Sequence, residues 1–270
     1  RYYGLTHFKV KLSGNLESDL LRLKNIAQML GQLVPEFKFT LDGNEQYPNV
    51  MAFREHWEQF LKDPILESFL GDSHLLFVEQ PIHRDFALHE SVREEIESWD
   101  SGPAMIIDES DGELDSLRRA IELGYRGTSH KNCKGVFKGI ANACLLESLR
   151  REGTGPWILS GEDLANVGPV ALLNDLAVMS SLGIQHVERN GHHYFSGLSV
   201  FPRSLQQDIC SVHPDLYEWI DSGFASLIIR EGSILTESII SAPFGCGMEL
   251  TEKILLNLGD SGLISGQFSD

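Results

Sequence analysis

The sequence has 270 residues, a hydrophobic content of 42% and a formal net charge of −17. This charge disfavours nucleic acid and anionic membranes as partners, because their phosphates repel an acidic protein. The sequence lacks the long apolar run of a membrane-spanning helix. Its 4 cysteines show no Cys-x-x-Cys spacing, which indicates reduced thiols in a cytoplasmic protein.

Short apolar runs alternate with longer segments of helical periodicity along the chain. The apolar runs predict strands near residues 7–12, 37–41, 75–78, 104–107, 127–130, 157–159 and 184–187. The periodic segments predict helices near residues 16–33, 51–70, 90–99, 113–123, 136–151 and 170–182. Strands that alternate with helices of this length predict parallel βα units, and the chain length fits one α/β barrel of ~250 residues.

The segment from about Arg203 onward is less regular than the rest of the chain. It contains a proline- and glycine-rich corner at residues 242–247. Its aromatic residues Tyr217, Trp219 and Phe224 are interpreted as helix packing rather than as a cage around a ligand.

Carboxylates end three successive predicted strands, at Asp42, Glu79 and Asp108. A single acid after a strand is often a helix cap or a turn residue. Three in consecutive units favour a shared site, because adjacent strand ends of a parallel barrel lie ~5 Å apart. Three anions at such short distances repel one another unless a cation is present. One hard divalent ion is therefore predicted, Mg²⁺ first, with Mn²⁺ as the alternative.

Lysines flank these carboxylates in strand order. Lys9 and Lys11 alternate with apolar residues and so face one side of their strand, which is the interior in a barrel. On an edge strand the same pattern would be ordinary polar alternation. Lys131 follows the predicted strand at residues 127–130, across the mouth of a closed barrel. A lysine near a divalent cation and a second ammonium has a lowered pKa and can act as a base.

Other polar residues follow later strands. Glu162 and Asp163 come after the predicted strand at residues 157–159, where helix capping and contact with a polar substrate are both open. His192 and His193 follow the last predicted strand. Adjacent histidines of a strand point to opposite sides, so one metal rarely binds both. Contact with a substrate and a structural role remain as alternatives for this pair.

Six motifs occur in order between about residue 4 and residue 250. They are Lys9-Val10-Lys11, Asp42-Gly43-Asn44, Glu79-Gln80-Pro81, Asp108-Glu109-Ser110, Lys131-Asn132-Cys133-Lys134 and the glycine-rich stretch from Pro243 to Glu249. This ordered set resembles the enolase superfamily, and within it the muconate-lactonizing and mandelate-racemase-like enzymes. The resemblance implies a TIM-type barrel of the (β/α)7β kind, without its first strand and without the family's N-terminal capping domain.

The resemblance also implies a domain organisation. Residues 1–250 would form the catalytic barrel, with strands 2 to 8, and residues 251–270 a C-terminal tail that packs on the barrel or on the cap. The missing cap and first strand fit a fragment or an extracted domain better than a complete enzyme. The resemblance further implies a small carboxylate substrate and a homo-oligomer.

The resemblance assigns roles to the site residues. Asp42, Glu79 and Asp108 would bind one Mg²⁺ ion, and Asn44 would lie beside the first of them. Lys11 and Lys131 would be general acid/base groups on opposite faces of the substrate. Lys9 would help to neutralise the substrate carboxylate. Glu162, Asp163, His192 and His193 are the candidate residues for contact with the rest of the substrate.

The implied function is a Mg²⁺-dependent isomerase, either a racemase/epimerase or a cycloisomerase. Such an enzyme removes the α-proton of a carboxylate substrate through an enediolate. One alternative is a dehydratase or lyase of a hydroxy acid, acting on an acid sugar or like o-succinylbenzoate synthase, by the same half-reaction. A second alternative is a non-catalytic metal-binding barrel.

Overall fold

The computed structural model describes residues 3–34, 36–71, 73–162, 166–189 and 195–248. The chain divides into two compact units. The first unit comprises Arg1–Glu162 and His186–Glu188, and the second comprises Asp163–Gln185 and Arg189–Asp270. The expected tail at residues 251–270 lies outside the described residues, so the domain boundary at residue 250 stays a prediction.

All the strands predicted in the first unit are present, and they are parallel. β1 (His7–Lys11), β2 (Lys38–Asp42), β3 (Leu75–Glu79) and β4 (Met105–Ile106) form one sheet in that order. β5 (Gly127–His130), β6 (Ile158–Glu162) and β7 (Val187–Glu188) form a second sheet. A parallel bridge between Ile107 and Thr128 connects the two sheets. The predicted α/β fold of parallel strands alternating with helices is therefore confirmed.

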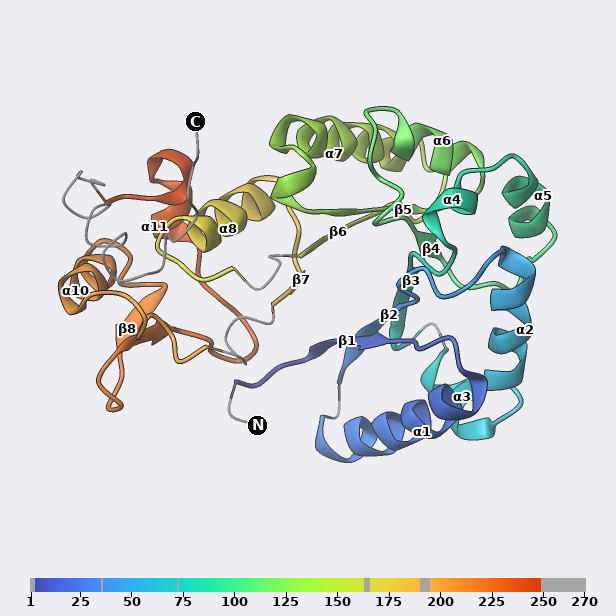
Figure 1. Cartoon of the computed structure of the whole chain (residues 1–270), viewed down its shortest axis with the longest axis horizontal. Helices are drawn as coiled ribbons and strands as arrows, with labels where there is room; N and C mark the ends of the chain where they lie inside the picture. Colours follow the sequence, from blue (N-terminus) through green and yellow to red (C-terminus); the bar gives the residue numbers. More distant parts are fainter. Residues whose placement is uncertain (1–2, 35, 72, 163–165, 190–194, 249–270) are drawn as a thin grey trace, which may run out of the picture. The chain divides into compact units, whose positions relative to one another are not determined.

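Helices connect these strands and lie along the outer side of the row of strands (Figure 1). α1 (Leu16–Leu33) and α7 (Val136–Arg151) have the predicted bounds, and a 3-10 turn, η1 (Asn132–Lys134), precedes α7. The remaining helices of this unit are α2 (Val50–Phe60), α3 (Pro64–Phe69), α4 (Arg84–Ala87), α5 (Ser91–Glu97) and α6 (Ser116–Glu122).

The helix expected at residues 51–70 is divided into α2 and α3. Asp63 accepts hydrogen bonds from the N–H groups of Ile65 and Leu66, and Pro64 occupies the first helical position of α3. Both features are typical of a helix start, because proline has no N–H to donate and a capping carboxylate satisfies free donors. A new helix therefore begins at Pro64.

The core of the first unit lies between the strands and the helices. Phe39 and Leu41 of β2 are fully buried in a cluster that includes Leu23 of α1 and Phe53 of α2. Because successive side chains of a strand point to opposite faces, Asp42 then points away from this core. The same alternation directs the strand-end carboxylates to the face that the helices leave uncovered.

The second unit consists of shorter elements around its own core. It contains α8 (Ala171–Ser181), α10 (Arg203–Val212), the antiparallel strands β8 (Tyr217–Trp219) and β9 (Ala225–Leu227), α11 (Glu237–Ile240) and the turn η2 (Pro243–Gly245). The core is built from apolar residues of these elements, among them Leu172, Leu176, Ile209, Leu216 and Ile239.

The interpretation of Tyr217, Trp219 and Phe224 as helix packing holds only in part, because Tyr217 and Trp219 share a core with Leu205 and Ile209 of α10 but are not helical themselves. Tyr217 and Trp219 lie in β8, and Trp219 pairs with Ala225 of β9. Gly223 has a φ angle of 89° in the connecting turn, a conformation that glycine adopts without strain and that folds the chain into a hairpin. Among the described residues, no helix is both long enough and apolar enough to cross a membrane.

Candidate functional site

The parallel register places the charged strand ends of the first unit side by side. Lys11 is the register partner of Asp42, and Asp42 is the register partner of Glu79. On the second sheet Glu162 is the register partner of Glu188. The backbone pairing of the strands thus brings these charged strand ends together, as the sequence predicted.

Three carboxylates form a group that could hold a metal ion. Glu79, Asp108 and Glu162 each offer an oxygen, and these oxygens lie within 4.8 Å of one another. Glu79 and Asp108 are predicted metal ligands, whereas Glu162 was expected to contact substrate. The third predicted ligand, Asp42, contacts Lys9 at 3.1 Å and Lys11 at 2.7 Å. Its role as a ligand stays a prediction.

The donor set fits a hard divalent cation. Glu79 Oε1 is buried and accepts no hydrogen bond from the residues that the structure describes. Leaving a buried acceptor without a partner costs ~1–3 kcal/mol, so this oxygen favours an additional ligand. Carboxylate oxygens are the donors that Mg²⁺ and Mn²⁺ prefer. Glu79, Asp108 and Glu162 could therefore hold such an ion.

Lys9 lies among the carboxylates with its side chain 12% exposed. Its ammonium group is 2.5 Å from Glu188 and 2.9 Å from Glu79, in addition to its contact with Asp42. Burial opposes the charge of Lys9, but Glu79, Asp42 and Glu188 together raise its pKa above the ordinary value. The predicted inward orientation of Lys9 is what produces these contacts.

Lys11 and Lys131 approach the group at different points. Lys11 donates to Asp42, and its side chain is 51% exposed. Lys131 is more enclosed and lies 2.8 Å from Asp108 and 2.9 Å from Glu162. Lys11 therefore has one carboxylate partner at the open edge, and Lys131 has two.

The pKa values of both lysines shift upward. Burial opposes the charged form of each, but Asp42 raises the pKa of Lys11 and Asp108 and Glu162 raise that of Lys131. The lowered lysine pKa expected from the sequence requires the charge of a divalent cation. The protein groups alone shift both pKa values in the opposite direction.

The carboxyl groups respond differently to their surroundings. Burial raises the pKa of Glu79 to about 7, although the ammonium group of Lys9 opposes the shift. Burial also acts on Asp108, but Lys134 and Lys131 hold its pKa below the ordinary value. Glu79 is thus the carboxyl group of this pair whose protonation changes near neutral pH.

Sequence reasoning missed two members of the cluster, Glu188 and Lys134. Glu188 ends β7 and is the nearest carboxylate to Lys9, so the strand-end rule that found Glu79 would also have found it. Lys134 lies in η1 and is 2.5 Å from Asp108, and it also donates to the carbonyl oxygen of Ser129. Its place depends on the turn η1, which the apolar pattern did not reveal.

Gln80 fixes the loop that carries Asp108. Its Oε1 accepts hydrogen bonds from the N–H groups of Asp108 and Ser110 at 2.8 and 3.1 Å. Its Nε2 donates to the carbonyl oxygen of Ile82 and to the hydroxyl of Ser110. All four hydrogen-bonding sites of this buried amide are therefore used, and they join the end of β3 to the end of β4.

The close approach of two backbone segments explains the glycine of the Asp42-Gly43-Asn44 motif. A Cβ atom on Gly43 would lie 2.4 Å from Cα of Pro81, so only glycine permits this approach. The N–H of Asn44 donates to Oδ1 of Asp42. The Asn44 side chain is exposed and donates to Glu109 at 3.1 Å, so its contact with substrate stays a prediction.

Three predicted substrate contacts cannot be located. Asp163, His192 and His193 lie outside the described residues, so their roles stay predictions. The described part of the cluster comprises five carboxylates and four lysines, namely Asp42, Glu79, Asp108, Glu162, Glu188, Lys9, Lys11, Lys131 and Lys134. We refer to this set as the carboxylate–lysine cluster.

Comparisons with known proteins support the fold. No protein-family model matches the chain, and no curated protein matches its sequence. A mandelate racemase/muconate lactonizing enzyme from Roseiflexus sp. superposes with a TM-score of 0.51 at 16% identity, over 69% of this chain and 49% of that chain. The chain therefore has an α/β fold of parallel strands alternating with helices, consistent with the barrel domain of these enzymes.

Two further solved structures give similar values. A mandelate racemase/muconate lactonizing protein from Herpetosiphon aurantiacus has a TM-score of 0.49 at 21% identity, over 69% of this chain and 48% of that chain. A racemase from Streptomyces coelicolor A3(2), solved with bound magnesium, has a TM-score of 0.49 at 18% identity, over 72% of this chain and 47% of that chain. The chain spans about half the length of the solved structures that it matches. The resemblance stated from the sequence is confirmed as a likeness of fold.

Proposed function

We propose that the chain is the barrel part of a Mg²⁺-dependent isomerase, a racemase/epimerase or a cycloisomerase, that removes the α-proton of a small carboxylate substrate. The observation that carries this proposal is the group of Glu79, Asp108 and Glu162, whose oxygens converge within 4.8 Å between lysines from other strands. Two buried carboxylates and a partly buried one, with ammonium groups beside them, suit binding of a metal and an anion together. The likeness of fold to mandelate racemase/muconate lactonizing enzymes supports the same proposal.

The charges of the cluster support an anionic substrate. Five carboxylates face four ammonium groups, so the described cluster carries one excess negative charge when all are ionised. One divalent cation would change this to one excess positive charge. A substrate with a single carboxylate would then neutralise the site, and a neutral or cationic substrate would not.

The ion would be held by Glu79, Asp108 and Glu162, with Asp42 as a further proposed ligand. When bound, Mg²⁺ supplies Lewis acidity that stabilises negative charge developing on the substrate carboxylate. Gln80 keeps the Asp108 loop in place through its hydrogen bonds. Lys9, enclosed among carboxylates, helps to neutralise the substrate.

The proton transfers are assigned to Lys11 and Lys131. They come from β1 and from the segment after β5, so they approach the cluster from different strands. A lysine must lose its proton before it can act as a base. The contacts with Asp42 and Asp108 oppose that loss, and the positive charge of a bound divalent cation would favour it. Reprotonation by the second lysine, or ring closure or opening, would then complete the isomerisation.

Two alternatives share part of this chemistry. A dehydratase or lyase of a hydroxy acid would begin with the same proton abstraction and then expel a leaving group. Lys134, 2.5 Å from Asp108, is a further ammonium group that could protonate such a leaving group. A non-catalytic metal-binding barrel is favoured by one observation, the direct pairing of Lys9, Lys11 and Lys131 with carboxylates, which raises their pKa values.

Exchange of the α-proton in D₂O tests the proposal. The protein is incubated with Mg²⁺ and a pooled library of carboxylates, and deuterium incorporation is followed by mass spectrometry. We expect exchange to fall by about 10²–10⁴ in Lys11→Ala and in Lys131→Ala. Lys62→Ala serves as the matched control, because Lys62 contacts Gln59 on the outer surface.

The outcomes separate the alternatives. Loss in both variants supports a two-base isomerase, and loss in one variant with expulsion of a leaving group supports the lyase. Mg²⁺ binding without exchange of any carboxylate would count against the enzyme and favour the non-catalytic barrel.

A further inference from the structure

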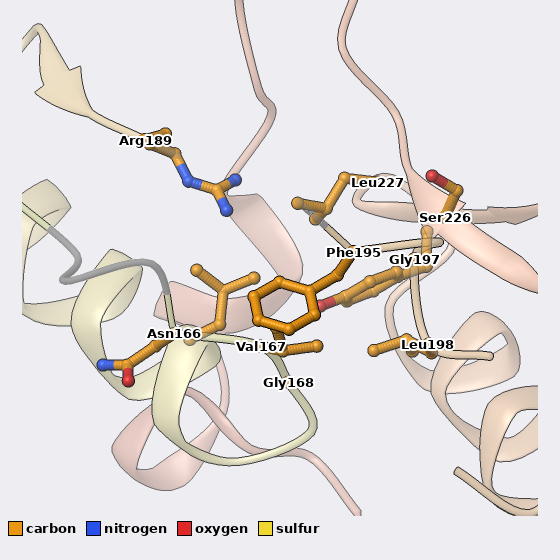
Figure 2. Close-up of a pocket in the computed structure, with 11 residues that line it drawn as sticks. Asn166, Val167, Gly168, Arg189, Phe195, Gly197, Leu198, Ser226 and Leu227 are labelled. Carbon is orange, nitrogen blue, oxygen red and sulfur yellow. The ribbon is translucent and has the colours of Figure 1, made fainter. Parts of the chain in front are cut away.

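The second unit contains a pocket that shares no lining residue with the carboxylate–lysine cluster. It is formed by the segment before α8, by the loop before α10 and by the β8–β9 hairpin (Figure 2). The pocket has about 340 Å³ of empty space, part of it open to solvent. Because part of this space is open solvent, the enclosed part is small and suits only a compact ligand.

Most of the pocket wall is apolar. Val167, Leu172, Phe195, Leu198 and Leu227 line it. Leu172 and Leu198 are buried, whereas the Phe195 side chain is 45% exposed. The wall therefore suits the apolar body of a small ligand, with Phe195 able to cover it from the solvent side.

A buried hydroxyl group also lines the pocket. Tyr217 is 2% exposed, and its Oη has no hydrogen-bond partner among the residues that the structure describes. Gly168 lies against it, and a Cβ atom at that position would be 2.7 Å from Tyr217 Oη. Glycine thus leaves the space beside the hydroxyl open. Buried hydroxyl groups are normally hydrogen-bonded, so an acceptor from a ligand would complete this one.

A positive charge accompanies the hydroxyl. The guanidinium group of Arg189 points toward Phe195 and Leu227 (Figure 2). Burial raises the pKa of Tyr217, and the charge of Arg189 opposes that shift, so its field reaches the hydroxyl. The amide of Asn166 is already engaged, because it donates to Asp175 at 2.5 Å. A guanidinium offers five N–H donors and a tyrosine hydroxyl one, so both side chains can donate to an acceptor in the pocket.

We propose that this pocket binds a small organic monocarboxylate, with its carboxylate between Arg189 and Tyr217 and its apolar body against the leucine and phenylalanine side chains. A carboxylate can accept from a guanidinium and a hydroxyl at the same time. Inorganic phosphate would leave the apolar wall without contact. A neutral apolar molecule would gain nothing from the two donors. The site is separate from the proposed Mg²⁺ chemistry and does not depend on it.

Benzoate is the probe for this site, and its neutral analogue benzamide is the comparison. Binding is measured by titration calorimetry on the whole chain in the presence of EDTA, so that the metal-dependent chemistry is silent. We expect saturable binding of benzoate and at least tenfold weaker binding of benzamide, because a charged acceptor strengthens both hydrogen bonds. Lys62→Met should keep the benzoate affinity, since Lys62 contacts Gln59 on the surface of the first unit and does not line the pocket.

Two variants test the two donors. Arg189→Met should weaken benzoate binding by about tenfold or more, and Tyr217→Phe by about fivefold to tenfold. Arg230→Met is the matched control, because Arg230 belongs to the same unit, is 77% exposed and does not line the pocket. If Arg189→Met does not fold, Tyr217→Phe decides, since it removes one oxygen that has no partner among the described residues.

Three results would overturn the proposal. One is the absence of saturable benzoate binding. Another is equal affinity for benzoate and benzamide, which would leave only an apolar cavity. The third is an unchanged benzoate affinity in Tyr217→Phe.

Discussion

The carboxylate–lysine cluster of the first unit and the pocket of the second unit are built on opposite principles. In the cluster, ammonium groups such as Lys9 already contact carboxylates at 2.5–3.1 Å, so most of the charge is paired within the protein. In the pocket, the buried Tyr217 hydroxyl stands among apolar side chains and has no hydrogen-bond partner among the described residues. The first arrangement favours a ligand that rearranges existing ion pairs. The second favours a ligand that brings the acceptor with it.

The largest effect is expected for Lys9→Met in the cluster. Removing one partner of a buried ion pair leaves uncompensated charge and costs about 3–5 kcal/mol of unfolding free energy. Lys24→Met is the control, because Lys24 pairs with Asp63 at 2.5 Å on the surface, where such pairs contribute ~0–1 kcal/mol. Urea denaturation measures both values.

The same stability measurement in the presence of Mg²⁺ adds a second comparison. We expect Mg²⁺ to raise the stability of Lys9→Met more than that of the unmodified protein, because the ion can replace the lost positive charge. An equal loss of stability in the Lys9 and Lys24 variants would contradict the buried cluster.

The two units offer a matched pair of buried glutamines for a second test. Gln80 binds the Asp108 loop, and Gln206 accepts from the N–H of Ala225 and donates to the carbonyl oxygen of Phe201. Gln80→Met and Gln206→Met should each lower the unfolding free energy by about 2 kcal/mol, because backbone groups lose their partners.

Only Gln80→Met should also weaken Mg²⁺ binding, by about tenfold or more, since it acts through the loop that carries Asp108. Calorimetric titration with Mg²⁺ distinguishes the two variants. If both variants lose affinity for Mg²⁺, or if neither does, the proposed role of Gln80 in holding the Asp108 loop is contradicted.

Mg²⁺ binding should also depend on pH. The pKa of Glu79 is raised to about 7, and a carboxyl group must lose its proton to bind a cation. The Mg²⁺ affinity should therefore fall as the pH decreases below about 7, by up to about tenfold per unit, and level off above it. Titrations between pH 5.5 and 8.5 would show this, and a flat profile would remove Glu79 from the site.

A smaller pH effect is expected on the stability of the second unit. His213 is buried, its Nε2 accepts from the N–H of Gly247, and its Nδ1 contacts the Ser238 hydroxyl. Burial lowers its pKa, although Asp215 opposes the shift. His213 therefore binds its proton more tightly in the unfolded chain than in the folded chain. The stability that neutral His213 contributes is fully present above its unfolded pKa of ~6.5 and is lost as the pH falls below that value.

Thermal unfolding of the protein between pH 5 and 8 measures the His213 effect. We expect the midpoint to fall by a few degrees toward pH 5, and His213→Gln to reduce this dependence. An identical pH dependence in the variant would assign the effect to other groups.

The smallest effect on stability is expected for Tyr217→Phe. Its hydroxyl has no partner among the described residues, so removing it should change the unfolding free energy by less than about 1 kcal/mol. Urea denaturation without ligand provides the value. A loss of 2 kcal/mol or more would show that the hydroxyl is already hydrogen-bonded.

The sequence revealed the part of the site that follows from strand periodicity. Asp42 and Glu79 were predicted because each ends an apolar run, and parallel pairing then brings them together. Lys134 was missed because its position depends on a short 3-10 turn, and Glu162 was assigned to the substrate because its distance from Asp108 depends on how the two sheets meet.

The second unit was harder to predict for a related reason. The run Tyr217-Glu218-Trp219 is too short for its alternation to be separated from a helical pattern, and the turn at Gly223 determines the hairpin. The pocket is lined by residues from three separate segments, and no helical or strand periodicity of the sequence connects them. Its existence follows from tertiary packing, which local pattern does not encode.

The strand-end origin of the cluster has a consequence for how such a protein changes over time. Each of the seven parallel strands contributes one charged residue at or just beyond its end, namely Lys11, Asp42, Glu79, Asp108, Lys131, Glu162 and Glu188. The apolar residues that hold each strand to its helix are different positions. Selection or directed evolution can therefore change these charges without rebuilding the strand–helix contacts. Because the buried charges are paired, as Lys131 is with Asp108, an exchange of one has to be matched by an exchange of its partner.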